Sequence, residues 1–182
     1  MKNLLIINGS PRAKGVNAEV IMQVKPYFAD CIIKEYDVYK LAPAPCTACG
    51  YCEMHDGCSN RDLDVFFADL EDADYIAFFT PVYNNFFPAP LKAVIDRFQR
   101  YYSARFCRGA KPPIEKPKNV GVVITSGSNS RQNADFMCAT LRQCFSVMNG
   151  ELKARYYIPN TDSANYTFNI PELEKFVHQL KR

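Results

Sequence analysis

The stretch LLIINGSPRAKGVN, residues 4–17, decides the fold. Its first four residues form a continuous apolar run, which is typical of a strand buried on both faces. Asn8-Gly9 ends the run with a turn signal, and a helical apolar stripe formed by Val20, Val24 and Phe28 follows. A buried strand, a tight loop and a helix in this order predict the first β-α unit of a parallel sheet.

The same alternation recurs four more times along the chain. Continuous apolar runs predict strands at 75–79 and 120–125, whereas runs interrupted by polar residues predict strands at 32–38 and 152–158. Helical stripes are expected at 62–72, at 91–98, at 134–148 and from Pro171 onward. In the strand order 2-1-3-4-5, the second and fifth strands lie at the edges, which explains why these two are half polar. We predict a single α/β domain over residues 1–182, a three-layer sandwich with a five-stranded parallel sheet in the order 2-1-3-4-5.

Composition limits the classes of function. Hydrophobic residues make up 48% of the chain and charged residues 23%, as in ordinary globular proteins. The net charge of +3 is scattered along the chain. The basic residues around the Pro-rich excursion 110–117 are expected to lie in a solvated loop; these are Arg108, Lys111, Lys116 and Lys118. We therefore expect no nucleic-acid partner. No apolar run reaches the roughly 20 residues of a membrane span, and the N-terminus resembles neither signal nor anchor. Eight cysteines without a secretory signal favour a reducing, cytoplasmic location.

The loop from Gly9 to Asn17 is a candidate phosphate site. Ligands of such sheets bind beyond the carboxyl ends of the strands, where strands 1 and 3 diverge. Free amides and the positive dipole end of the following helix favour an anion, and Ser10, Arg12 and Asn17 add hydrogen-bonding groups. The loop lacks the glycine patterns of dinucleotide and Walker A loops and suits a single terminal phosphate. A simple helix-capping turn uses the same residue types and stays open as an alternative.

Two further loops lie on the same predicted rim. The segment TPVYNNFFP, residues 80–88, combines amides with aromatic side chains, as a site for a flat heteroaromatic ring requires. The aromatic residues could equally cap the core. Ser126-Gly127-Ser128 follows the fourth strand and offers backbone donors to the edge of a ring.

Four cysteines form the sharpest local pattern, Cys46-x2-Cys49-x2-Cys52-x5-Cys58, in a loop spanning 43–60. Two-residue spacings allow successive thiolates to converge on one metal centre. Four thiolates suit either a [4Fe–4S] cluster or Zn²⁺, and a metal-free thiol loop is a third possibility. His55 in the same loop and His178 near the C-terminus are expected at the surface. The other cysteines are expected in or near the core: Cys31, Cys107, Cys138 and Cys144.

Taken in order, NGSPR (8–12), TPVY (80–83) and LKAVIDR (91–97) resemble the NADPH-dependent FMN reductase family of the flavodoxin superfamily. The Cys-rich loop resembles its iron–sulfur flavoprotein branch, which favours iron–sulfur over zinc. The resemblance implies FMN, with its phosphate held by Ser10, Arg12, Asn17 and Ala18. It implies a ring site formed by Pro81, Val82, Tyr83, Asn84, Ser126, Gly127 and Ser128. The chain departs from the family at Val16-Asn17, where Asn-Thr or Asn-Ser is common, and at Asn84-Asn85, where a Gly commonly follows the Tyr.

These features predict an FMN-dependent oxidoreductase in which the flavin carries the chemistry and no side chain is catalytic. A reduced nicotinamide, NADH or NADPH, or a protein would donate electrons to a small-molecule or protein acceptor, and the cluster would relay single electrons. A ferredoxin-type protein is one candidate partner. Because the Cys loop follows an edge strand, away from the flavin rim, we expect a homodimer or homotetramer. The alternatives are a cluster-free NAD(P)H-dependent FMN or quinone reductase, a flavodoxin-like carrier and a redox or metal sensor. Substrate specificity is expected in the loops at 84–88 and 100–117.

Overall fold

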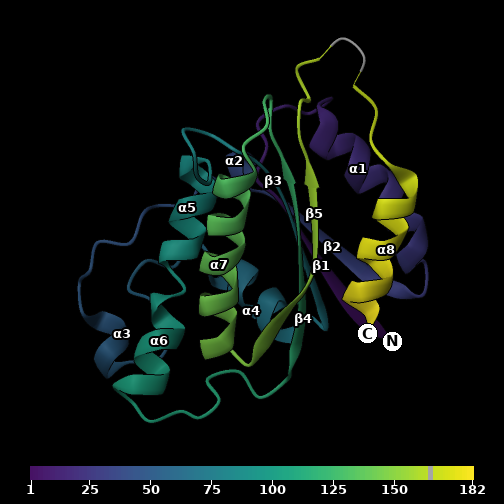
Figure 1. Ribbon diagram of the computed structural model, residues 1–182. Coiled ribbons are helices and arrows are strands. Elements are labelled where there is room, and N and C mark those ends of the chain that lie inside the picture. The colour runs from purple at the N-terminus through teal and green to yellow at the C-terminus, as the bar shows by residue number, and fades with distance from the viewer. Residues whose placement is uncertain (164–165) are drawn as a thin grey trace.

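The sheet is made of five parallel strands in the order β2-β1-β3-β4-β5 (Figure 1), so the predicted order is confirmed. The structure is a computed structural model that describes residues 1–163 and 166–182. The strands are β1 (Lys2–Asn8), β2 (Cys31–Asp37), β3 (Tyr75–Pro81), β4 (Lys118–Thr125) and β5 (Gly150–Ile158). The inner three are buried along most of their length, whereas β2 and β5 at the edges alternate between covered and exposed residues.

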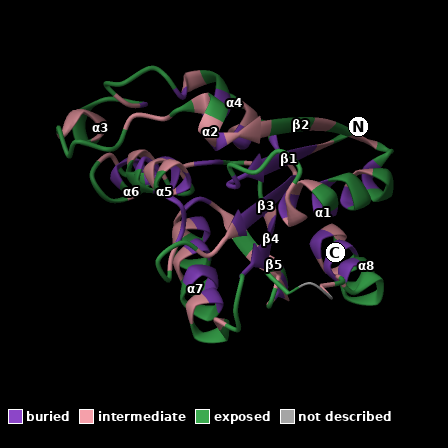
Figure 2. Cartoon of the chain, turned by 90° about the horizontal axis from the view of Figure 1, so that it is seen from above, coloured by how far each residue is buried: buried purple, intermediate pink, exposed green. Residues whose placement is uncertain are grey.

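Helices cover both faces of the sheet, as the view from above shows (Figure 2). On one side lie α1 (Val16–Val24), the 3-10 helix η1 (Lys25–Phe28) and α8 (Ile170–Lys181). On the other side lie α4 (Asp64–Asp72), α5 (Ala89–Asp96), α6 (Gln99–Phe106) and α7 (Arg131–Val147). The short helix α2 (Val38–Leu41) lies directly before the Cys loop, and the short helix α3 (Tyr51–Met54) lies within it. Each face of the sheet thereby has its own apolar core.

One predicted helix has different limits, and one helix was not predicted. The first ends at Val24, because Pro26 follows in a 3-10 turn, although Phe28 stays fully buried. The segment 100–117 was expected to be a loop, but its first part is the helix α6, so this prediction was wrong. Tyr101 and Ala104 are buried at a helical spacing that continues the stripe of α5, and this periodicity was present in the sequence.

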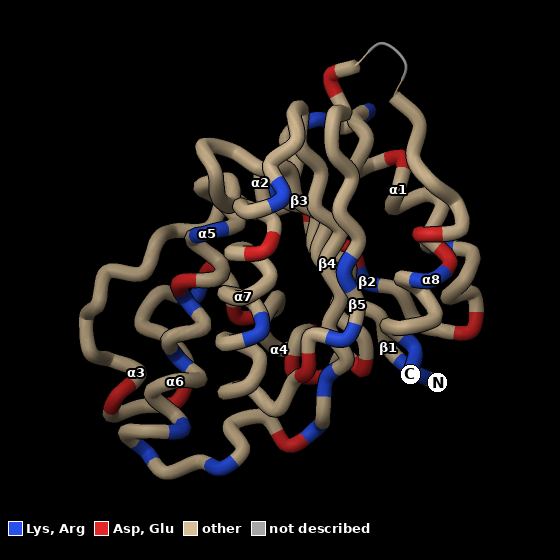
Figure 3. The backbone as a smooth tube through the Cα atoms, viewed as in Figure 1, with Lys and Arg blue, Asp and Glu red and all other residues tan. Residues whose placement is uncertain are grey.

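Of the four basic residues around 110–117, Lys111 is exposed as expected, whereas Arg108, Lys116 and Lys118 are partly or fully covered and make specific contacts. Lys118 is 1% exposed, and its ammonium group donates to the carbonyl oxygen of Glu71 at the end of α4. Burial lowers the pKa of Lys118 to about 8. Lys116 lies 3.0 Å from the carboxylate of Asp74, and Arg108 contacts the Cys loop. The charges seen along the tube in Figure 3 therefore include cations that lock loops to helices.

The predictions for the histidines and for the cysteines outside the Cys loop are correct with one exception. His55 and His178 are exposed, as expected. Cys138 is buried and Cys144 and Cys31 are partly covered, but Cys107 is exposed and was placed wrongly, because it follows the last turn of α6. Among the helices of the described residues, none has the length and apolar character needed to cross a membrane.

Candidate cofactor sites

The loop after β1 is held in place by its own backbone. The amide of Gly9 donates to the carbonyl oxygen of Phe79 on β3 at 2.7 Å. A Cβ at this position would lie 2.7 Å from Cδ2 of Leu91, so only glycine lets α5 pack so closely against the loop. The side chain of Asn8 accepts from the amide of Ser10 at 3.0 Å, and the hydroxyl of Ser10 accepts from the amide of Arg12 at 3.3 Å. The loop is thus shaped before any ligand arrives.

The start of α1 has hydrogen-bonding groups to spare. Gly15 is its N-cap, and no side chain caps the first amides. Asn17 is 2% exposed, and its Oδ1 atom has no hydrogen-bond partner among the described residues. A buried amide without a partner is costly unless a ligand satisfies it. Free helix amides next to Ser10 and Arg12 make this end of α1 suited to an anion.

The loop after β3 forms a tight turn at the carboxyl end of the sheet. The amide of Tyr83 donates to the carbonyl oxygen of Phe86 at 2.9 Å, and the reverse bond has the same length. Asn84 and Asn85, between them, have φ values of 46° and 68°. Asn tolerates this left-handed region better than other non-glycine residues, which explains why Asn can stand where the family commonly has Gly. The amide of Val82 donates to Thr125 on β4 at 2.8 Å and fixes the turn beside the next loop.

The loops after β4 and β5 join at the same rim. The amide of Ser126 donates to the carbonyl oxygen of Ile158 at 3.0 Å, and the amide of Thr161 donates to the carbonyl oxygen of Ser126 at 2.9 Å. The carboxylate of Asp162 packs over Gly127, where its Oδ2 would lie 2.2 Å from a Cβ. Thr161 and Asp162 were not predicted. Their position after the carboxyl end of a parallel strand was the signal that could have found them.

These four loops surround two adjoining hollows. One, of about 140 Å³, is lined by Ser10, Arg12, Gly15, Val16, Asn17, Pro81, Val82, Tyr83, Thr125, Gly127, Thr161 and Asp162. The other, of about 320 Å³, is lined by Val82, Asn84, Asn85, Ser126, Gly127, Ser128, Ser130 and Asp162. Val82, Gly127 and Asp162 line both. The structure therefore brings together every residue expected at the cofactor except Ala18, which lines neither hollow.

The four cysteines of the Cys loop line a third hollow, of about 350 Å³, together with Asp96 and Gln99 from the junction of α5 and α6. Cys46 and Cys49 are exposed, and Cys52 and Cys58 are partly covered. Within residues 1–163 and 166–182, no three His, Cys, Asp or Glu side chains lie close enough together to hold a metal ion. The thiols thus face one hollow without converging on one point.

Individual thiols of this loop have polar partners. The sulfur of Cys49 lies 3.1 Å from the hydroxyl of Ser59, and that of Cys52 donates to the hydroxyl of Ser103 at 3.4 Å. The hydroxyl of Ser59, followed by the backbone amide of Tyr51, lowers the pKa of Cys49 below that of an ordinary thiol. In Figures 1 and 2, α3 lies on the outer side of the helical layer, well away from the start of α1. The Cys hollow and the rim hollows are separate in one chain.

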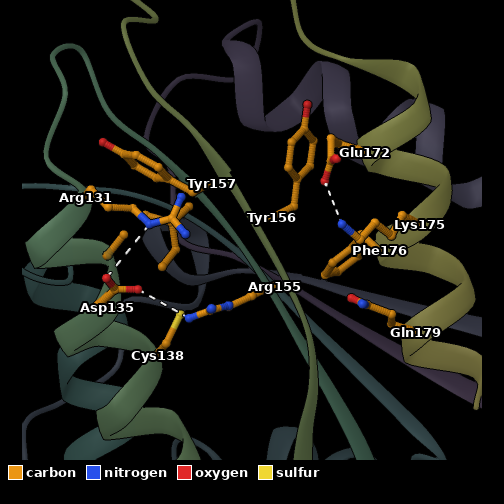
Figure 4. Close-up of a pocket in the computed structure, with 12 residues that line it drawn as sticks. Arg131, Asp135, Cys138, Arg155, Tyr156, Tyr157, Glu172, Lys175, Phe176 and Gln179 are labelled. Carbon is orange, nitrogen blue, oxygen red and sulfur yellow. Dashed lines mark hydrogen bonds and ion pairs between the residues drawn. The ribbon is translucent and has the colours of Figure 1, made fainter.

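A further hollow, of about 460 Å³, lies between α7 and α8 along β5 (Figure 4). Its charged side chains are paired with one another: Arg131 and Arg155 lie 3.8 and 3.3 Å from Asp135, and Lys175 lies 3.6 Å from Glu172. Because these cations already have partners, the hollow is not prepared for an anion, and no predicted cofactor residue lines it.

A parallel sheet in this order, with an anion-suited loop after β1 and an amide-rich turn after β3, defines the flavodoxin-like class of α/β proteins. The chain matches the model of the NADPH-dependent FMN reductase family over residues 2–158, and it belongs to this family. The resemblance noted in the sequence is confirmed.

Two curated relatives and one solved structure illustrate the similarity. The chain is 39% identical over 95 residues to an iron–sulfur flavoprotein of Methanosarcina thermophila, a match that covers 50% of this chain and only 49% of that protein. It is 27% identical over 165 residues to FMN-dependent NADH:quinone oxidoreductase 4 of Pseudomonas fluorescens, covering 81% of this chain and 79% of that protein. The structure of an NAD(P)H:quinone oxidoreductase from Methanothermobacter marburgensis shares the fold, with a TM-score of 0.69 at 16% identity over 99% of this chain and 92% of that one.

Proposed function

We propose that the chain binds FMN in the two adjoining rim hollows and acts as an NAD(P)H-dependent oxidoreductase. The observation that carries this proposal is the convergence of four loops on hollows lined by the residues expected for a flavin phosphate and ring. Membership of the NADPH-dependent FMN reductase family supports it. FMN, when bound, supplies the hydride and electron chemistry, and the protein's part is to hold and orient it.

The smaller hollow suits the phosphate. Ser10 and Arg12 and the uncapped amides of α1 can donate to phosphate oxygens. The buried amide of Asn17 can accept from a ribityl hydroxyl or, with its amide turned over, donate to the phosphate. Ala18, beyond the hollow, would contribute no more than its backbone amide.

The larger hollow suits the edge of the ring. Val82 and Asn84 would line one side of it and Ser126, Gly127 and Ser128 the other. Pro81 and Tyr83, which line the smaller hollow, would contact the ring where the two hollows adjoin. Asp162 lines both hollows; because a carboxylate accepts hydrogen bonds but repels a phosphate, we assign it to a ring N–H at their junction rather than to the phosphate. None of these groups needs to act as an acid or base.

Titration of the flavin-free chain with FMN tests the site. We expect one FMN per chain and oxidised-flavin absorption bands at about 370 and 450 nm. A protein that is purified colourless and cannot be loaded with FMN would contradict the proposal. Steady-state oxidation of NADH and NADPH with a quinone acceptor then tests the activity, because a flavodoxin-like carrier should oxidise neither directly.

We also propose that Cys46, Cys49, Cys52 and Cys58 ligate a [4Fe–4S] cluster. All four line one hollow, four thiolates are the usual donor set of such a cluster, and a relative bears the name iron–sulfur flavoprotein. The separation of this hollow from the rim hollows favours a homodimer or homotetramer. We propose a ferredoxin-type protein as a partner and the cytoplasm as the location.

Iron and acid-labile sulfide analysis of anaerobically purified protein tests the cluster. About four of each per chain, with a shoulder at about 400–420 nm, is the expected result. Stoichiometric zinc without sulfide would identify a zinc site instead. The second candidate is a cluster-free FMN-dependent quinone reductase, favoured by the similarity to the Pseudomonas NADH:quinone oxidoreductase. Protein that retains FMN but contains neither iron nor sulfide would support this candidate and contradict the cluster.

A further inference from the structure

Arg97 is a buried arginine at the end of α5, next to the Cys loop. Its side chain is only 1% exposed. One guanidinium nitrogen donates to the carbonyl oxygen of Asn60 at 2.5 Å, and another pairs with Oδ1 of Asp62. The guanidinium carbon Cζ lies over the ring of Phe67, 5.8 Å from its centre. Arg97 is therefore fixed on both sides, by the core beneath it and by the end of the Cys loop.

Asp62 extends this contact to the other end of the loop. Its second carboxylate oxygen, Oδ2, accepts from the backbone amide of Ala44 at 2.9 Å. Arg97 and Asp62 thus tie residue 44 to residues 60 and 62, and all four cysteines of the pattern lie between these points. The middle of the loop has an anchor of its own, since Arg108 donates to the carbonyl oxygen of Cys52 and pairs with Asp56 at 3.0 Å.

Stability alone does not account for this arrangement. Removing a guanidinium from water is costly, and a buried ion pair often contributes no more stability than apolar side chains of the same volume. Arg97 even leaves its Nε atom buried without a partner among the described residues. What the pair does achieve is geometric: a planar fork holds one carbonyl and one carboxylate at fixed positions. It also accounts for the last residue of LKAVIDR, which contacts neither rim hollow.

We propose that Arg97 is a positioning residue for the Cys loop. Together with Asp62 it closes the loop at its base, so that the four cysteine side chains face one hollow before any metal is bound. This inference rests on the proposed metal centre for its purpose, but the closure itself is a property of the metal-free chain.

Hydrogen exchange of metal-free protein tests the closure directly. In Arg97→Lys and Asp62→Asn, amides between residues 44 and 62 should exchange about 10–100-fold faster than in the wild type, because a charge-assisted contact that holds the loop closed is lost. Arg105→Lys is the matched control: Arg105 lies on α6 and donates to carbonyl oxygens of Ser146 and Val147, 3.4 Å away, outside the Cys loop. Exchange of the loop in this variant should match the wild type.

Cobalt binding supplies a readout that a purely structural role would leave unchanged. Co²⁺ bound by several thiolates gives a sulfur-to-metal charge-transfer band, and its apparent affinity should fall about 10–100-fold in Arg97→Lys, as for other residues that orient metal ligands. FMN affinity should stay unchanged, because Arg97 lines neither rim hollow.

Each outcome decides between the proposals. Wild-type exchange rates and Co²⁺ affinity in both Arg97→Lys and Asp62→Asn would overturn the role of Arg97. Faster loop exchange in these variants, with a wild type that binds neither Co²⁺ nor a cluster, would keep the closure and reject the metal centre. If Arg97→Lys fails to fold, Asp62→Asn, which keeps the shape of the side chain, decides the question by the same two measurements.

Discussion

The rim hollows and the Cys hollow are built in different ways. At the rim, loops follow directly from the central strands, and backbone bonds such as those from Gly9 to Phe79 and from Val82 to Thr125 fix their positions. The Cys loop leaves an edge strand and is held by side chains, chiefly Arg97, Asp62 and Arg108. The rim is thus shaped by the sheet, whereas the Cys loop is tethered at a few points and its thiols stay apart.

This difference agrees with what each site is proposed to bind. A phosphate is recognised by backbone amides and a few donors, which the ends of parallel strands place at the same edge in every sheet of this order. A metal centre supplies most of its own organisation, because the bonds to its ligands form only when it binds. The two sites should therefore respond independently to substitution.

The largest effect is expected from Cys49→Ser. Loss of one thiolate from the four should abolish cluster assembly, so that iron and sulfide fall to near zero. The amount of FMN per chain should not change, since Cys49 lines neither rim hollow. Metal analysis and the flavin spectrum of the same sample measure both. Cys107→Ser, at an exposed cysteine outside the pattern, is the control. A loss of FMN in Cys49→Ser would show that the two sites are coupled.

The next largest effect is expected from Arg12→Ala. Removing a charge-assisted contact to phosphate should weaken FMN binding by about 10–100-fold, since such bonds contribute about 1.5–3 kcal/mol. Iron content should stay at the wild-type level. Lys14→Ala in the same loop is the matched control, because Lys14 is exposed and does not line the hollow. Equal losses of FMN affinity in the two variants would mean that the loop attracts phosphate only through its net charge.

The contrast between the two sites also explains which features could be predicted from the sequence. Strand order and the rim residues could be predicted, because apolar continuity reports which strands are central and topology places the loops that follow them. The buried positions of Arg97 and Lys118 could not, since charged residues in a polar context indicate solvent, and only the packing of distant segments shows that they are covered. The helix α6 was missed although its stripe was present, because the Pro-rich segment after it indicated a loop.

A smaller effect is expected within the Cys loop from Ser59→Ala. The hydroxyl of Ser59 stabilises the thiolate of Cys49, so its removal should raise the pKa of Cys49 toward the ordinary value. In metal-free protein near neutral pH, the thiolate fraction then falls and alkylation of Cys49 by iodoacetamide should slow by a few fold, roughly in proportion to that fraction. Rates read peptide by peptide across pH measure this. Ser103→Ala, next to Cys52, should leave the Cys49 profile unchanged. An unchanged profile in Ser59→Ala would mean that the remaining donors, first the backbone amide of Tyr51, lower the pKa of Cys49 without the hydroxyl of Ser59.

The smallest effect is expected at the rim, from two substitutions of Asn85. Its φ of 68° costs most residues about 1 kcal/mol or more, so Asn85→Ala should lower the free energy of unfolding by about 1 kcal/mol. Asn85→Gly relieves the backbone but loses the bond from the amide of Asn133 at 2.9 Å and makes the unfolded chain more flexible, so its change should stay within about 0.5 kcal/mol. Urea denaturation compares the two. If Asn85→Gly is neutral to stability yet changes the KM for NADH or NADPH, the side chain of Asn85 contacts the electron donor, and the departure from the family serves specificity; if KM is unchanged, Asn serves only to make the turn.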